Sequence, residues 1–128
     1  MSGPSGTEKV LAEWFFDQAG APCLILDESR IRNGRGVVVG WVNGSNVYLR
    51  HGQHVGWFEG GVIYDSTNCA LAYSRNRTGY LPSGTAVRGG TALPALPEAP
   101  PSPQFAVPPG KPGRGAWSRH DPGNYFAA

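Results

Sequence analysis

The stretch HVGWFEGGVIYD, residues 54–65, repeats the pattern of VVGWVNGSNVYL, residues 38–49, which lies sixteen residues earlier. In both stretches an apolar run with Gly-Trp at its centre is followed by a glycine turn and a second apolar run that ends near a tyrosine. Short runs of β-branched and aromatic residues on both sides of a glycine turn are typical of a β-hairpin. The two stretches therefore predict two equivalent hairpins.

The same sixteen-residue period continues without a gap from residue 15 to residue 80. Two columns of the repeat hold mostly residues that tolerate a positive φ, as turns require. These columns are Gly20, Gly36, Gly52 and Asn68, and Glu28, Gly44, Gly60 and Asn76. Each period supplies two strands and two turns, which predicts eight strands of about four to six residues. Asn43-Gly44 predicts a type I′ hairpin turn, and Glu59-Gly60 occupies the matching place.

Two further columns describe the faces of these strands. Because side chains alternate between the two faces of a strand, each column faces one way throughout the repeat. One column contains large apolar residues: Ile25, Trp41, Trp57 and Tyr73. The preceding column contains Leu24, Gly40, Gly56 and Ala72, and glycine inside a strand indicates close approach of another group.

A family resemblance follows from these stretches. WFFDQAGAPCLILDESRI, GVVVGWVNGSNVYL and GQHVGWFEGGVIYDSTNCAL resemble the bacterial four-fold beta-flower proteins, in which four hairpin-like petals surround a pseudo-four-fold axis. The resemblance covers about residues 14–80 and extends to the terminal segment WSRHDPGNYF. It implies an all-β fold of four repeated hairpin units about that axis and implies no established activity. Eight strands would equally fit a closed barrel.

The composition changes between residues 80 and 90. Ten of the 12 prolines lie from Pro82 onward, and the net charge is −2 up to Ser74 and +4 after it. We expect a leader at 1–13 with a short helix as one option, a four-repeat β domain at 14–83, a Pro/Gly-rich linker at 84–116 and an aromatic anchor at 117–128. The linker should be extended, because proline and glycine oppose helix and sheet.

Several classes of function find no support. The chain has no signal-peptide pattern and no apolar run of about 20 residues, so we expect a cytoplasmic protein without a membrane partner. Without a Lys/Arg cluster we expect no nucleic-acid partner. Cys23 and Cys69 lack metal-site spacing and are expected to be buried free thiols. No nucleophile or phosphate-binding motif occurs, so we assign no catalytic residue, cofactor or metal.

The candidate binding or interface residues are aromatic and histidine side chains: Trp41, Trp57, Tyr48, Tyr64, Tyr73, His51 and His54. A body this small buries little surface, which favours a non-catalytic binding or assembly module that self-associates or has a protein partner. Trp117, Tyr125 and Phe126 are too apolar for a free end, and we expect them to dock on the body, in cis or on a neighbouring subunit.

Two alternatives remain open at this point. Flat aromatic faces together with His51, His54 or Asp65 could form a carbohydrate or metal site, or an enzyme. Pro-x-x-Pro spacing in the linker could instead make the chain a peptide adaptor that is recognised through its tail.

Overall fold

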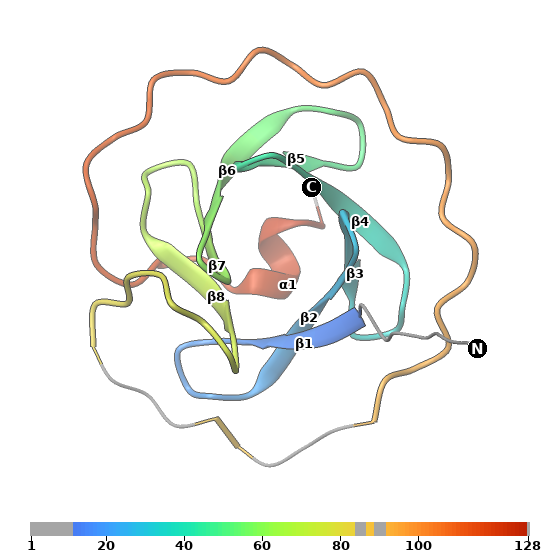
Figure 1. The fold of residues 1–128 in the computed structure, drawn as a ribbon, viewed down its shortest axis with the longest axis horizontal. Helices are drawn as coiled ribbons and strands as arrows, with labels where there is room; N and C mark the ends of the chain where they lie inside the picture. The colour runs from blue at the N-terminus through green and yellow to red at the C-terminus, as the bar shows by residue number, and fades with distance from the viewer. Residues whose placement is uncertain (1–11, 84–86, 89–91, 128) are drawn as a thin grey trace, which may run out of the picture.

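The computed structural model describes residues 12–83, 87–88 and 92–127, and residues 12–74 form a closed antiparallel barrel (Figure 1). Each strand pairs with the next along the chain, and the last pairs with the first. The strands are β1 (Ala12–Phe16), β2 (Pro22–Asp27), β3 (Arg30–Asn33), β4 (Val38–Asn43), β5 (Asn46–Leu49), β6 (His54–Glu59), β7 (Val62–Tyr64) and β8 (Ala70–Ser74). The predicted all-β fold is confirmed, and the closed sheet is consistent with the four-hairpin fold that the resemblance implies.

The tight hairpin turns lie at one end of the barrel. In the register of β4 with β5, Asn43 pairs with Asn46, so the central turn residues are Gly44 and Ser45. Of these two, Gly44 alone has a positive φ, at 65°. A positive φ at the first central residue alone fits a type II′ turn, so the predicted type I′ turn at Asn43-Gly44 is wrong in both position and type.

Irregularities of the sheet recur at intervals of sixteen residues. The register shifts at Phe15/Phe16, Ile31/Arg32, Val47/Tyr48 and Ile63/Tyr64. The turns at the opposite end of the barrel contain Gly20, Gly36, Gly52 and Asn68, with φ of 85°, 90°, 98° and 63°. A bulge increases the local twist and bends its strand, which helps an eight-stranded sheet to close.

The barrel interior is a packed apolar core. Its most buried members include Phe15, Leu24, Ile31, Val47 and Ile63, each no more than 1% exposed. Partly buried residues such as Phe58 pack on this core at the end of the barrel that carries the hairpin turns. The interior is therefore filled by side chains.

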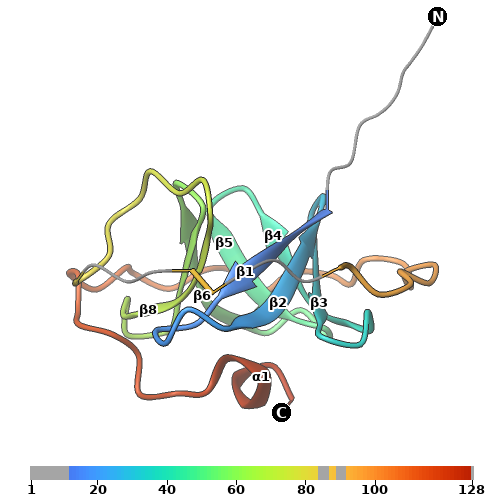
Figure 2. The same cartoon turned by 90° about the horizontal axis from the view of Figure 1, so that it is seen from below.

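The tail encircles the barrel. Figures 1 and 2 show its described residues running around the outside of the strands at mid-height, after which the chain turns beneath one end. We call residues 87–88 and 92–116 the belt, and residues 117–127 the cap. The belt contains no helix or strand. The cap contains α1 (Pro122–Tyr125), which the sequence reading did not anticipate.

The expected leader and linker can be compared with the structure only in part. β1 begins at Ala12, inside the range expected for the leader. The short helix considered for the leader does not include Ala12 and Glu13, which lie in β1, and residues 1–11 lie outside the described residues, as do 84–86 and 89–91 of the linker and residue 128. Over the described part of the chain, no helix has the length and apolar character needed to cross a bilayer.

Candidate binding surface on the outer wall

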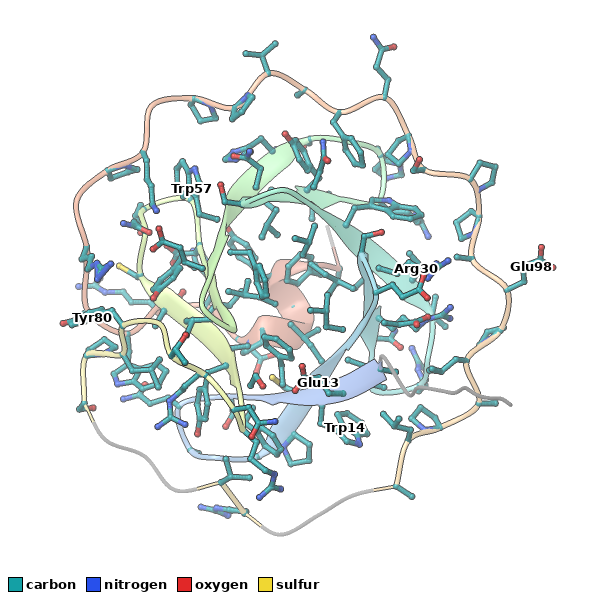
Figure 3. All side chains as sticks on the ribbon, in the orientation of Figure 1. Glu13, Trp14, Arg30, Trp57, Tyr80 and Glu98 are labelled. Atoms are coloured by element: carbon teal, nitrogen blue, oxygen red, sulfur yellow. The ribbon has the colours of Figure 1, made fainter. Side chains whose placement is uncertain are left out.

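The outer face of the barrel carries most of the large aromatic side chains, and we call this face the outer wall. Trp41, Trp57, Tyr48, Tyr64 and Tyr73 are all predicted site residues, and each is between 0 and 4% exposed. Trp57 lies on the outer side of β6, towards the belt (Figure 3). An outward-facing residue of a bare barrel would be exposed to solvent. The belt and cap therefore account for this burial.

One part of the wall is covered by Phe105 of the belt. Its ring lies 4.5 Å, centroid to centroid, from the ring of Tyr48, tilted by 34°. Val38, Trp41 and Tyr48 form a cluster on which Phe105 and Ala99 pack. The indole nitrogen of Trp41 donates a hydrogen bond of 3.3 Å to the carbonyl of Arg50. The indole thus has a polar partner although its ring is buried.

A second part of the wall lies under the start of the belt and the cap. Phe16, Tyr64 and Tyr73 belong to one cluster, against which Val87 and Trp117 pack. The rings of Tyr73 and Trp117 are 6.0 Å apart, with a 60° interplanar angle. The hydroxyl of Tyr64 donates to the carbonyl of Tyr80 at 2.6 Å, and Nε1 of Trp117 donates to Oγ of Ser83 at 2.9 Å. The Tyr64 hydroxyl and the Trp117 indole nitrogen therefore both have partners at the edge of the cluster.

Backbone contacts fix the belt at regular intervals. The amides of Arg88, Ala106 and Gly115 donate to the carbonyls of Gly20, Gly52 and Asn68 at 2.9, 2.9 and 3.1 Å. The acceptor residues are separated by multiples of sixteen residues, which is the period of the barrel repeat. The donor residues are separated by multiples of nine residues and so share a nine-residue period. The remaining place on that period is Pro97, which has no amide hydrogen and lies next to Gly36. We call the turns that contain Gly20, Gly36, Gly52 and Asn68 the inter-unit turns. In one circuit of the barrel the belt thus contacts all four, in the order in which they occur along the chain.

Glycine is required at two of these turns for a second reason. A Cβ on Gly36 would overlap the carbonyl oxygen of Ala95, and one on Gly52 would overlap that of Gln104. These two carbonyls are again nine residues apart. The glycines therefore combine a positive φ with close approach of the belt.

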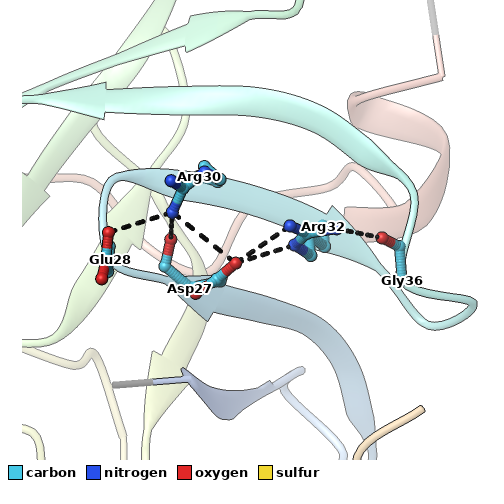
Figure 4. A network of polar contacts seen from close by, with 5 residues as sticks. All are labelled: Asp27, Glu28, Arg30, Arg32 and Gly36. Carbon is cyan, nitrogen blue, oxygen red and sulfur yellow. Dashed lines mark hydrogen bonds and ion pairs between the residues drawn. The ribbon is translucent and has the colours of Figure 1, made fainter. Parts of the chain in front are cut away.

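In the second unit a buried ion pair replaces an aromatic residue on the wall (Figure 4). Arg32 occupies the repeat position of Tyr48 and is 3% exposed. Its Nη2 lies 3.0 Å from Oδ2 of Asp27, its Nε donates to the same oxygen, and its Nη1 donates to the carbonyl of Gly36 at 2.7 Å. Arg30 and Glu28 extend the network towards solvent. The guanidinium has several partners, as a buried charge requires.

A hydrogen-bonded clasp joins the cap to the barrel at Asp65. The hydroxyl of Ser118 donates to Oδ2 of Asp65 at 2.6 Å, and the amides of Thr67 and Cys69 donate to Oδ1 at 2.9 and 3.0 Å. Burial alone would raise the pKa of Asp65, but the hydrogen bonds from Ser118, Cys69 and Thr67 outweigh it and lower the pKa. Ser118 also donates its amide to the carbonyl of Ala70 at 2.8 Å. Asp65 therefore connects an inter-unit turn to the tail.

The cap closes the end of the barrel opposite the hairpin turns. Phe126 is 4% exposed and belongs to the interior cluster. A Cβ on Gly40 would lie 3.0 Å from the ring of Phe126, so the small residue leaves room for the ring. The hydroxyl of Tyr125 donates to the carbonyl of Val55 and accepts the amide hydrogen of Ser66. The predicted docking residues Trp117, Tyr125 and Phe126 thus all contact the body of the same chain.

The histidines and carboxylates considered for catalysis or metal binding do not converge on a site. His51 is exposed in the β5–β6 turn, beside a cleft of about 570 Å³. His54 packs edge-on to Tyr48 and Trp57, its Nε2 lies 3.1 Å from Oδ1 of Asn46, and burial lowers its pKa. Within residues 12–83, 87–88 and 92–127, no three potential metal ligands gather.

The aspartates of the repeat cap turns. Oδ1 of Asp17 accepts the amides of Ala19 and Ala21, and the side chain of Asn33 does the same one unit later for Arg35 and Val37. Asp65 has this role in the fourth unit, with the clasp to Ser118 in addition. The side chains of Asp17, Asn33 and Asp65 therefore stabilise the backbone of these turns.

Both cysteines are free and half-buried rather than fully buried. Cys23 lies on β2, where burial raises the pKa of its thiol well above the ordinary range. Cys69 lies at the clasp, and a Cβ on Gly115 would lie 3.6 Å from its Cβ. Cys69 therefore faces the end of the belt.

Sequence reasoning missed how the belt and wall fit together. Pro94, Pro103 and Pro112 repeat at the nine-residue spacing of the belt, which is a signal that the sequence carries. No comparable signal identifies the pairing of Arg32 with Asp27, or that of Asp65 with Ser118, which is 53 residues away.

Comparison with known families supports the fold. A family model described as 4-fold beta flower protein matches residues 13–126, which include the barrel, the belt and most of the cap. The resemblance seen in the sequence is thereby confirmed and extends over the tail. No curated protein and no solved structure matches the chain.

Proposed function

We propose that this chain, which belongs to the 4-fold beta flower protein family, is a non-catalytic binding module whose outer wall holds an extended proline-rich segment. Its own tail is that segment in the structure. The observation that carries the proposal is the aromatic wall, buried beneath a belt that is anchored at every inter-unit turn where the belt has an amide hydrogen to donate.

The chemistry of the belt suits this role. Proline-rich segments adopt an extended conformation before binding, so they lose little entropy when they dock on aromatic grooves. A closed barrel has no edge strand that could accept a ligand as an added strand. Side-chain grooves and the carbonyls of inter-unit turns are what it can offer, and the belt contacts both.

Charge supports the same pairing. Residues 1–83 carry no net charge and residues 84–128 carry +2, so the attraction between tail and barrel comes from local pairs of charges. Glu59, at a hairpin turn, forms ion pairs with Lys111 at 3.2 Å and with Arg114 at 3.6 Å. Exposed ion pairs add little affinity, so they orient the belt while apolar contacts at Tyr48 and Tyr73 hold it.

The test is to make the tail a separable ligand. A protease recognition sequence placed between Ser83 and Val87 allows the folded chain to be cut after purification. We expect the tail fragment to co-elute with the barrel fragment at micromolar concentration, and an excess of synthetic peptide of residues 87–128 to displace it. Immediate separation after cutting would overturn the proposal.

A matched pair of variants tests the groove. Phe105 packs on Tyr48, whereas Val107, two residues away, is 89% exposed. In the cut protein, Phe105→Ala should weaken retention of the tail about tenfold, since it removes buried apolar surface. Val107→Ala should leave retention unchanged. Equal effects of the two substitutions would contradict the role of the wall.

A further inference from the structure

We propose that the tail of a second copy of this chain occupies the same outer wall, so that two copies assemble by exchanging belts and caps. This inference rests on the proposed function and names the partner. The surface involved is the aromatic wall together with the clasp at Asp65.

The tail can leave one barrel without dismantling it. All eight strand pairings of the closed sheet are made by residues 12–74, and the tail adds one isolated bridge between Ala70 and Trp117. The belt lies outside the strands throughout its described course (Figures 1 and 2). Release of the belt and cap therefore breaks contacts on the outer wall and withdraws Phe126 from the interior cluster, and it leaves the ladder hydrogen bonds intact.

Each contact between the tail and its own barrel could equally be made with the barrel of a second copy. Anchors at Arg88, Ala106, Gly115 and Ser118 are made to barrel groups that a second barrel offers identically. Leu81 packs on the wall ahead of them and stays with its own barrel. Exchange thus keeps the described contacts from Arg88 onward, made to the barrel of the second copy, which is the general reason why swapping of an element costs little.

Charge and concentration determine when exchange occurs. Residues 84–128 carry a net charge of +2, and their Lys111 and Arg114 pair with Glu59, which the barrel of another copy offers equally. In cis, a short tether gives an effective concentration on the order of millimolar. Exchanged dimers should therefore be a minor species at micromolar concentration and should increase with protein concentration.

The clasp supplies a covalent reporter. A Cβ on Gly115 would lie 3.6 Å from the Cβ of Cys69, within the range of disulfides, once the Sγ of Cys69, which it would overlap, turns to another rotamer; Gly115 does not have a positive φ. In full-length chain carrying Cys23→Ser, the substitution Gly115→Cys should form an intramolecular disulfide with Cys69 under mild oxidation. This reaction tests the docking of the tail in cis.

The trans experiment separates the two thiols between copies. A donor chain carries Gly115→Cys with Cys69→Ser, and an acceptor chain retains Cys69 and Gly115; both carry Cys23→Ser. Neither chain can form the disulfide alone. When they are mixed at high concentration and oxidised, we expect a heterodimer linked between position 115 and Cys69, identified by mass spectrometry of the joined peptides.

The control places the donor thiol at Gly110, where a Cβ would have nothing within 4 Å. We expect the donor with Gly115→Cys to give at least about tenfold more heterodimer than the donor with Gly110→Cys, because docking raises the local thiol concentration. Equal yields with a normal cis disulfide would overturn exchange and leave the proposed function standing. Failure of the cis disulfide would contradict both proposals.

Discussion

At the scale of single residues, polar groups hold the tail and the wall in place. Arg32 and Asp27 form a buried pair where other units have aromatic side chains, and Asp65 accepts hydrogen bonds from its own turn and from the cap. A buried polar group that loses its partner is costly, since water cannot replace the partner. These residues therefore give the sharpest predictions for substitution.

The buried pair predicts a large loss of stability on truncation. Arg32→Ala leaves the half-buried Asp27 with only the longer ion pair to Arg30, at 3.7 Å, and should lower the free energy of unfolding by about 2 kcal/mol, measured by urea denaturation. Arg35→Ala, at an exposed position of the following turn, is the control and should change it by less than about 0.5 kcal/mol. Similar effects of the two substitutions would show that the pair has no structural role.

The clasp predicts a dependence on pH. The pKa of Asp65 is lowered in the folded chain, so its ionised form contributes stability above its unfolded pKa, and this contribution is lost as the pH falls through the folded pKa. Ser118→Ala removes one hydrogen bond to the carboxylate and should cost about 2 kcal/mol at neutral pH.

Ser118→Ala should also lose less stability on acidification than the unsubstituted chain, because the pKa of Asp65 is lowered less when the hydrogen bond from Ser118 is absent. Urea denaturation at neutral and acidic pH measures both effects. Ser102→Ala, in an exposed part of the belt, is the control. An acid dependence that Ser118→Ala leaves unchanged would refute the assignment.

At the scale of elements, the inter-unit turns are the places where barrel and belt meet. Gly52 and Gly44 both have a positive φ, at 98° and 65°, but the belt lies against Gly52 alone of the two. A Cβ at Gly44 has nothing within 4 Å, whereas one at Gly52 overlaps the carbonyl oxygen of Gln104. The two glycines therefore separate backbone strain from contact with the belt.

Alanine at these two positions should have different consequences. Gly44→Ala should cost about 1 kcal/mol through backbone strain and leave the tail bound. Gly52→Ala should cost more and raise the susceptibility of the belt to limited proteolysis, because Gln104 must move away. The result against the account would be equal protease resistance in the two variants.

At the scale of the whole molecule, most of the barrel could be predicted from the sequence, but the course of the belt and cap could not. The periodic columns from Gly20 to Asn68 predicted the strands, since turn chemistry is local and repeats. The central residues of the β4–β5 turn were misplaced by one position, because register depends on the partner strand as well as on the Asn-Gly signal.

The tail was harder to predict for a physical reason. Its position depends on contacts across 53 and more residues, as between Asp65 and Ser118 or Val55 and Tyr125, and such pairs leave no local pattern. Aromatic residues such as Trp41 and Tyr48 were recognised as important from the sequence. What covers them could be decided only once the belt was placed.

The central claim, that the tail is bound around the barrel at regular intervals, is tested most directly by residue-resolved amide hydrogen exchange of the unsubstituted chain. The amides of Arg88, Ala106 and Gly115 donate to barrel carbonyls, and those of Val107 and Gly113 have no acceptor within the described residues. The account predicts slow exchange at the first three positions and fast exchange at the other two. Uniformly fast exchange from Arg88 to Gly115 would contradict it.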